Sequence, residues 1–252
     1  MSYSTLSRTI TEALQLTQPP IAVCFADSVP EGVKTHPGAV AAGCRFWQDA
    51  AEGVFATVSA DHELCSIGVY THNLEPAASQ QSAQQKDLGD ALKVFAGLGY
   101  VRAEDLAAIP VLQLKPKVVI YGPLDAVPLP PDVVLLFVKA DQALILSEAS
   151  QQLEGDLPPA MGRPACAVVP QAFNTGRTAL SLGCCGARAY LDILTPDVAM
   201  YAVPGAKFEA FTQRVAALAR ANTILTQFHA IRRRDVESGK RPSVEDSLMA
   251  MQ

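Results

Sequence analysis

The sequence contains no long hydrophobic run, and it has little charge and few aromatic residues. Of its 252 residues, 49% are hydrophobic, 18% are charged and 6% are aromatic. The longest apolar run, around residues 132–138, is strand-sized and far shorter than the roughly 18 residues of a membrane-spanning helix. We therefore expect no membrane association. The apolar fraction suffices for a sizeable core, which excludes a disordered chain.

An N-terminal targeting signal is also missing. Residues 1–16 lack both the basic segment and the continuous apolar segment of a signal peptide. We therefore expect a cytoplasmic location. In that reducing compartment, the six cysteines of the chain would remain free thiols and would not form disulfides.

Positive charge is scarce. The chain has 20 lysines and arginines against 25 aspartates and glutamates, which gives a net charge of -5. Nucleic-acid binding requires clustered positive charge, so we expect no nucleic-acid partner. The run at residues 232–234 is one short basic patch in an acidic chain, and we expect it to be solvated.

The signature motifs of several common protein classes are absent. There is no G-x-G-x-x-G after a strand, no phosphate-binding loop ending in G-K-S/T, no H-E-x-x-H and no G-x-S-x-G. Dinucleotide, nucleotide-triphosphate, zincin and α/β-hydrolase functions therefore lack their motifs. No C-x-x-C pair occurs either, so neither a zinc ribbon nor a ferredoxin-type cysteine run is present.

The order of helix and strand patterns along the chain is irregular. Residues 76–86 fit either a helix surface or a mobile loop, and Asp141 is expected to cap the helix that follows it. This irregular order predicts an α+β fold, with a mixed β-sheet and packed helices in a single compact domain over residues 1–230. Residues 231–252 are expected to form a charged, exposed C-terminal tail. The predicted helices are 4–16, 39–51, 87–98, 103–108, 142–152 and 205–228, and the predicted strands are 21–26, 54–58, 111–114, 117–121, 133–138, 165–169 and 199–203.

The cysteines differ in their neighbours. Cys24 and Cys166 lie in apolar patterns, where a free cysteine is usually a small core residue. Glycines accompany the other four, which are Cys44, Cys65, Cys184 and Cys185. A glycine beside a thiolate lets the backbone approach the sulfur and direct N–H groups at it. Three or four such thiolates can hold an iron–sulfur cluster or a zinc ion.

Several segments resemble the family known as domain of unknown function 169. They are QPPIAV at 18–23, GCRFWQDAAEG at 43–53, LCSIG at 64–68, SLGCCGAR at 181–188 and AVP at 202–204. The resemblance extends from about residue 14 to residue 222. It implies that Cys44, Cys65 and Cys184 are the family's recurrent thiols. Family members often carry a further cysteine where this chain has Ala187, so Cys166 is a candidate for a fourth thiol. The resemblance implies no reaction.

The leading hypothesis is an iron–sulfur cluster, of the 4Fe-4S type, with Cys44, Cys65 and Cys184 as ligands. Cys166 and Cys185 are further candidate ligands. Three thiolates would leave one iron open to act as a Lewis acid on a small anionic molecule.

The arginines beside two of these cysteines, Arg45 and Arg188, would favour thiolates and could bind that anion, although structural salt bridges suit them equally well. His62 and His72 lie near Cys65 and could ligate, but a lone histidine is more often a surface or hydrogen-bonded residue.

Two other interpretations stay open. One is a thiol or zinc-site protein, or a small-molecule binding module without catalysis. The other is an interaction subunit with structural cysteines. The sequence gives no oligomeric state, and a homo-oligomer is compatible with it.

Overall fold

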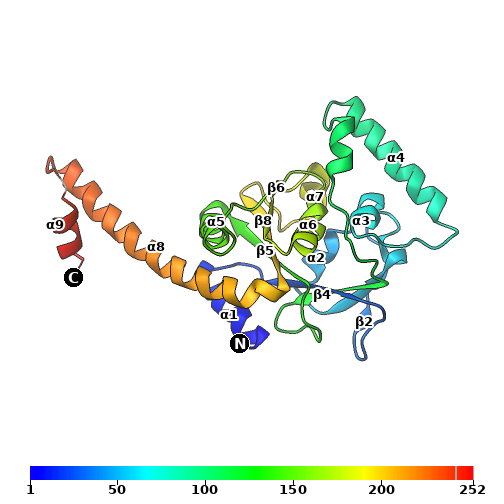
Figure 1. Cartoon of the computed structure of the whole chain (residues 1–252), viewed down its shortest axis with the longest axis horizontal. Helices are drawn as coiled ribbons and strands as arrows, with labels where there is room; N and C mark the ends of the chain where they lie inside the picture. The colour runs from blue at the N-terminus through cyan, green and yellow to red at the C-terminus, as the bar shows by residue number, and fades with distance from the viewer. Residues whose placement is uncertain (242, 252) are drawn as a thin grey trace.

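A mixed β-sheet runs through the part of the chain that the computed structural model describes, residues 1–241 and 243–251 (Figure 1). Its eight strands have the order β2-β3-β4-β1-β5-β8-β7-β6. The pairs β2–β3 and β6–β7 are parallel, and the other neighbours are antiparallel. The predicted α+β fold with a mixed sheet is confirmed. The strands are β1 (Ile21–Ala26), β2 (Lys34–Thr35), β3 (Phe55–Val58), β4 (Val118–Pro123), β5 (Val133–Lys139), β6 (Ala160–Met161), β7 (Ala179–Ser181) and β8 (Val198–Pro204).

Alternating side chains on the central strands make two hydrophobic cores, one on each face of the sheet. On β5, for example, Leu135 belongs to one core and Leu136 to the other. The α8 face is covered by α1 (Tyr3–Leu14), α5 (Ala140–Glu154) and the first turns of α8 (Phe208–Glu237). The α6 face is covered by α2 (Arg45–Asp49), α3 (Ser66–Thr71), α6 (Val168–Thr175) and α7 (Cys185–Tyr190). The 3₁₀ turns are η1 (Ser59–His62), η2 (Ala103–Ala108), η3 (Ala165–Ala167) and η4 (Gly205–Lys207).

Some predicted elements are wrong. The strand predicted at 165–169 is the η3 turn and the start of α6. A continuous run of buried apolar residues occurs in a buried helix as well as in a strand. Residues 111–114 form a loop, in which the N–H of Leu112 donates to the carbonyl of Thr71 at 2.9 Å. The helix predicted at 39–51 is reduced to α2. At the start of α5, Lys139 is the capping position and Asp141 lies in the first turn.

Two helices are longer than their patterns predicted. The helix α4 (Gln81–Gly97) begins inside the polar stretch at 76–86, which is therefore mostly helical. The helix α8 buries Phe208 and Val215 on the sheet, then continues past residue 228 into the predicted tail and projects from the body (Figure 1). A short helix, α9 (Val244–Met249), follows it. Pro242 and Gln252 of the predicted tail lie outside the described residues. None of the described helices combines the length and apolarity needed to cross a bilayer.

Gly205, directly after β8, is a position where we expect a side chain to be poorly tolerated. Its N–H donates to the carbonyl of Asp132 at 2.8 Å, and a Cβ placed there would lie 1.7 Å from the carbonyl oxygen of Pro131. Since both partners are backbone, no rotamer change relieves the clash. We expect Gly205→Ala to lower the free energy of unfolding in urea by about 3 kcal/mol. Gly53→Ala, where a Cβ meets no atom within 4 Å, is the control; equal stability of the two variants would contradict this account.

Candidate functional site

Four of the six cysteines line one cavity of about 310 Å³ on the α6 face of the sheet. Cys44 and Cys65 immediately precede α2 and α3, Cys166 lies in η3, and Cys184 immediately precedes α7. The first three are buried and Cys184 is half-buried, and all six cysteines are free thiols. The fold therefore brings the three thiols predicted as ligands to one cavity, together with Cys166.

The sulfur atoms receive hydrogen bonds from the surrounding chain. The N–H of Ala187 donates to the Cys184 Sγ at 3.5 Å, and the Thr71 hydroxyl donates to the Cys166 Sγ at 3.3 Å. Backbone N–H groups of Gly43 and Gly68 reach the Cys65 sulfur and act to lower the pKa of its thiol. A Cβ at Gly68 would lie only 2.9 Å from the Cys65 Sγ. Glycine thus permits the close approach of backbone to sulfur that the sequence suggested for this position.

Burial favours the protonated form of three of the cavity thiols, Cys44, Cys65 and Cys166. Burial, and to a smaller extent the neighbouring thiols of Cys65 and Cys184, raise the pKa of Cys44 to about 12. Burial likewise raises the pKa of Cys65 and of Cys166. At neutral pH the chain alone therefore holds these three as neutral thiols. A cation bound among them would reverse this preference, because it stabilises the negative thiolate.

His62 also lines the cavity and is buried. Its Nε2 lies 3.1 Å from the hydroxyl oxygen of Thr57, which also lies 3.2 Å from the carbonyl oxygen of Val119. When the hydroxyl donates its single proton to Val119, Nε2–H of His62 donates to the Thr57 oxygen. Nδ1 is left with a lone pair and has no hydrogen-bond partner within the described residues.

In His72 it is Nδ1 that has a hydrogen-bond partner and Nε2 that has none among the described residues. Its Nδ1 lies 3.1 Å from the carbonyl oxygen of Gly68, which can only accept, so Nδ1 carries the proton. Nε2 holds a lone pair and is likewise without a partner in the part of the chain that is described. Burial lowers the pKa of His62 to about 3 and that of His72 to about 4, so both rings are neutral. Neither is the exposed or fully hydrogen-bonded histidine that the sequence favoured.

The two predicted anion-binding arginines do not line the cavity. Arg45 forms ion pairs with Asp49 at 2.9 Å and Asp192 at 3.7 Å. Arg188 donates to backbone carbonyls, including that of Thr195 at 2.7 Å, and so braces the loop that carries Cys184. Both side chains thus have the structural contacts that the sequence left as an equal alternative.

The remaining two cysteines lie apart from the four. Cys24 is buried in β1 in the core of the α8 face, as predicted for a core residue. Cys185 is exposed and borders a neighbouring hollow rather than the thiol cavity.

The spacing of the thiols bears on the kind of metal centre they could hold. Among the described residues, no three His, Cys, Asp or Glu side chains are close enough to bind one metal ion. A tetrahedral zinc site, with Zn–S bonds of about 2.3 Å, needs its sulfurs roughly 4 Å apart. In a four-iron cluster each thiolate binds a different iron, so the sulfurs are farther apart and surround a larger volume. As they stand, the described thiols do not meet the first requirement.

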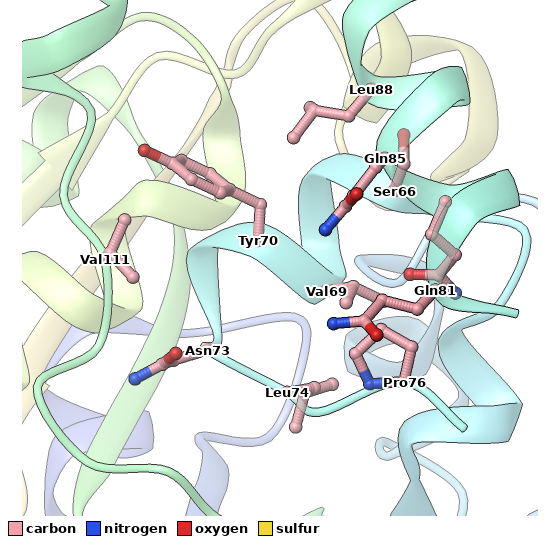
Figure 2. Close-up of a pocket in the computed structure, with 11 residues that line it drawn as sticks. Ser66, Val69, Tyr70, Asn73, Leu74, Pro76, Gln81, Gln85, Leu88 and Val111 are labelled. Carbon is pink, nitrogen blue, oxygen red and sulfur yellow. The ribbon is translucent and has the colours of Figure 1, made fainter. Parts of the chain in front are cut away.

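A separate hollow of about 220 Å³ lies between α3 and α4 (Figure 2). It contains no cysteine, and polar side chains such as Gln81, Gln85 and Asn73 border it. Gln80 donates to the Glu63 carboxylate, and Gln84 donates to the Glu63 carbonyl at 3.2 Å, which fastens the start of α4 to the segment before Cys65. These hydrogen bonds position α4. Within the described chain, the hollow itself is lined by no cysteine and no histidine, unlike the thiol cavity.

Burial and raised pKa predict selective thiol reactivity. With a pKa of about 12, Cys44 is a thiolate in only about one molecule in ten thousand at pH 8. We expect iodoacetamide to modify exposed Cys185 of the native, metal-free chain first, and to modify Cys44, Cys65 and Cys166 only after unfolding. Peptide mass spectrometry over a time course measures this order. Labelling of Cys44 as fast as Cys185 would contradict the described burial.

Comparison with known proteins gives a family but no characterised relative. No curated protein and no solved structure matches the chain. The model of the family DUF169, described as uncharacterised ArCR, matches residues 9–214. That range includes all four cavity cysteines and both buried histidines, and it ends within α8 before its projecting part. The chain therefore belongs to the family known as domain of unknown function 169.

Proposed function

We propose that the chain is an iron–sulfur protein whose cluster is held by Cys44, Cys65 and Cys184. One observation carries the proposal: four cysteines from distant parts of the sequence line a single cavity, and the other two lie elsewhere. The N–H groups directed at Cys65 and Cys184 support it, because hydrogen bonds to sulfur orient thiolate ligands and tune a cluster.

The electron-pair donors of the cavity favour an electropositive occupant. His62 and His72 each bring a lone pair that no described group satisfies, and a buried polar atom without a partner is unfavourable by about 1–3 kcal/mol. The cluster, when bound, would supply iron ions with redox or Lewis-acid chemistry. The chain would contribute the thiolate ligands, the close backbone approach at Gly43 and Gly68, and the exclusion of water by the α6-face core.

Cys166 determines whether the site is open or closed. With three ligands, Cys166 remains a thiol that accepts the Thr71 hydrogen bond, and one iron is free to bind a substrate. With four ligands the cluster is closed and suits electron transfer. The open form is the one we propose, with a small anionic molecule as its substrate. Because Arg45 and Arg188 have other partners, that anion needs a different cation.

A reducing, cytoplasmic setting is part of this proposal, since the ligands must persist as thiols before the cluster is inserted. The test is chemical analysis of protein purified without oxygen and reconstituted with iron and sulfide. We expect a brown protein with broad visible absorption and about four iron and four sulfide per chain after desalting. Stoichiometric zinc without iron would favour the zinc alternative, and a colourless protein with neither metal would refute both.

A further inference from the structure

A second hollow adjoins the thiol cavity. This α4 hollow, of about 300 Å³, lies between α4, η2 and α7 and is continuous with the thiol cavity. The two spaces share seven lining residues: Ile67, Leu92, Phe95, Pro164, Cys184, Gly186 and Tyr190. A molecule bound in it would therefore reach the wall formed by a proposed cluster ligand. Apolar side chains make most of its lining: Ile67, Leu92, Phe95, Val101, Leu106 and Ile109.

The helix α4 presents an apolar stripe to both spaces. Leu88, Ala91, Leu92 and Phe95 follow one another at helical spacing, line the thiol cavity and are only half-buried. The hydrogen bonds that Gln80 and Gln84, at the start of α4, donate to Glu63 hold this stripe in position. A concave, mainly apolar surface with few polar groups is the usual form of a small-molecule site, and 300 Å³ is at the small end of that class.

Arg163 provides a positive charge at the rim of the α4 hollow. Its guanidinium carbon lies 3.7 Å from the ring centroid of Tyr100, which holds the group flat against the ring. No ion pair or hydrogen bond of the Arg163 side chain is found among residues 1–241 and 243–251. Asp105 is near enough for Arg163 to help lower the pKa of its carboxyl, but Arg102 is the larger cause and binds that carboxylate directly. A stacked guanidinium keeps its N–H edge free for a carboxylate.

We propose that the α4 hollow binds a small aromatic carboxylate, with its carboxylate on Arg163 and its apolar body between α4 and Ile109. The body would then end beside Cys184. Binding in the hollow follows from the lining and from Arg163 alone, whereas its role as the substrate site rests on the proposed cluster. Arg163 would supply the positive charge for the anionic substrate, because Arg45 and Arg188 are engaged with other partners.

Calorimetric titration of the cluster-free chain with 2-naphthoate tests the binding, with 2-naphthamide as the uncharged analogue. We expect Arg163→Gln to weaken 2-naphthoate binding about fivefold and to leave 2-naphthamide binding unchanged. Ile109→Trp fills the hollow and should abolish binding of both. Arg220→Gln, an exposed arginine on α8, is the matched control and should bind like the wild type. The proposal is overturned if 2-naphthoate does not bind, or if Arg163→Gln or Ile109→Trp has no effect.

A second measurement separates this inference from the proposed function. In reconstituted protein, 2-naphthoate should shift the electron paramagnetic resonance signal of the reduced cluster in the wild type and not in Ile109→Trp. Binding without any shift would overturn the assignment of the hollow as the substrate site. If no cluster forms, the proposed function fails, while titration of the cluster-free chain still decides whether the α4 hollow binds the carboxylate.

Discussion

Serine in place of Cys44, Cys65 or Cys184 is expected to abolish the cluster, with iron and sulfide falling from about four per chain to near zero. Each of these thiolates would hold a different iron, so the loss of one leaves two protein ligands. The variant proteins should also lack the broad visible absorption expected of the reconstituted wild type. Iron and sulfide analysis after anaerobic reconstitution measures the loss, and far-ultraviolet circular dichroism checks that each variant folds.

The chain offers two matched controls for this series. Cys24→Ser makes the same substitution in the core of the opposite sheet face, and Cys185→Ser makes it at an exposed position beside Cys184. Both should retain iron and sulfide. Cys166→Ser should retain a cluster with an open iron, whereas its loss would assign Cys166 as a fourth ligand. Retention of the cluster in all three ligand variants would rule out the proposed site.

Acid should destabilise the metal-free chain steeply below pH 6.5. His62 and His72 have pKa values of about 3 and 4 in the folded chain, against about 6.5 when unfolded. Between these values the unfolded chain binds protons that the folded chain does not. The stability from neutral, buried imidazoles is therefore complete above pH 6.5 and is lost as the pH falls toward 4. Each histidine should lower the free energy of unfolding by up to about 1.4 kcal/mol per pH unit.

Substitutions at these two histidines separate their contribution to the pH dependence of stability from the contribution of aspartates and glutamates, which also titrate in acid. His62→Gln and His72→Gln should each reduce the slope of stability against pH between 6 and 5, whatever their stability at neutral pH. His229→Gln removes an exposed histidine of α8 and should leave the slope unchanged. Urea unfolding at a series of pH values gives these slopes. Slopes equal to that of the wild type in both buried variants would show that the rings are not held neutral.

The family resemblance, and not the glycine neighbours alone, selected Cys44, Cys65 and Cys184, because Cys185 also has glycine neighbours. The requirement that the glycines were taken to indicate is the approach of backbone to sulfur. At Gly68 this requirement is met within the same short segment as Cys65. The strand predicted around Cys166 was wrong because an apolar run in a strand and one in a short buried helix have similar composition. Its segment turns into α6 and not into the sheet.

Other features of the site depend on contacts that no local pattern records. The hydrogen-bond environment of His62 depends on Thr57 and, through it, on the carbonyl of Val119 on β4. Arg188 binds whichever carbonyls the fold brings near it, so its structural role could not be told from anion binding. The strand pattern of the sheet was largely predictable, but its order was not, since β8 pairs with β5 across the 58 intervening residues 140–197.

The position of β8 in the sheet has a consequence for the timing of biosynthesis. This strand is hydrogen-bonded between β5 and β7, and it comes after all four cavity cysteines in the chain. A ribosome must therefore release residues up to Pro204 before the sheet that supports the cavity can close. At ordinary translation speeds, Cys44 and Cys65 precede Cys184 by roughly ten seconds. Before the sheet closes, these thiols lack the burial that the finished fold gives them, so insertion of the proposed cluster would have to follow the synthesis of β8.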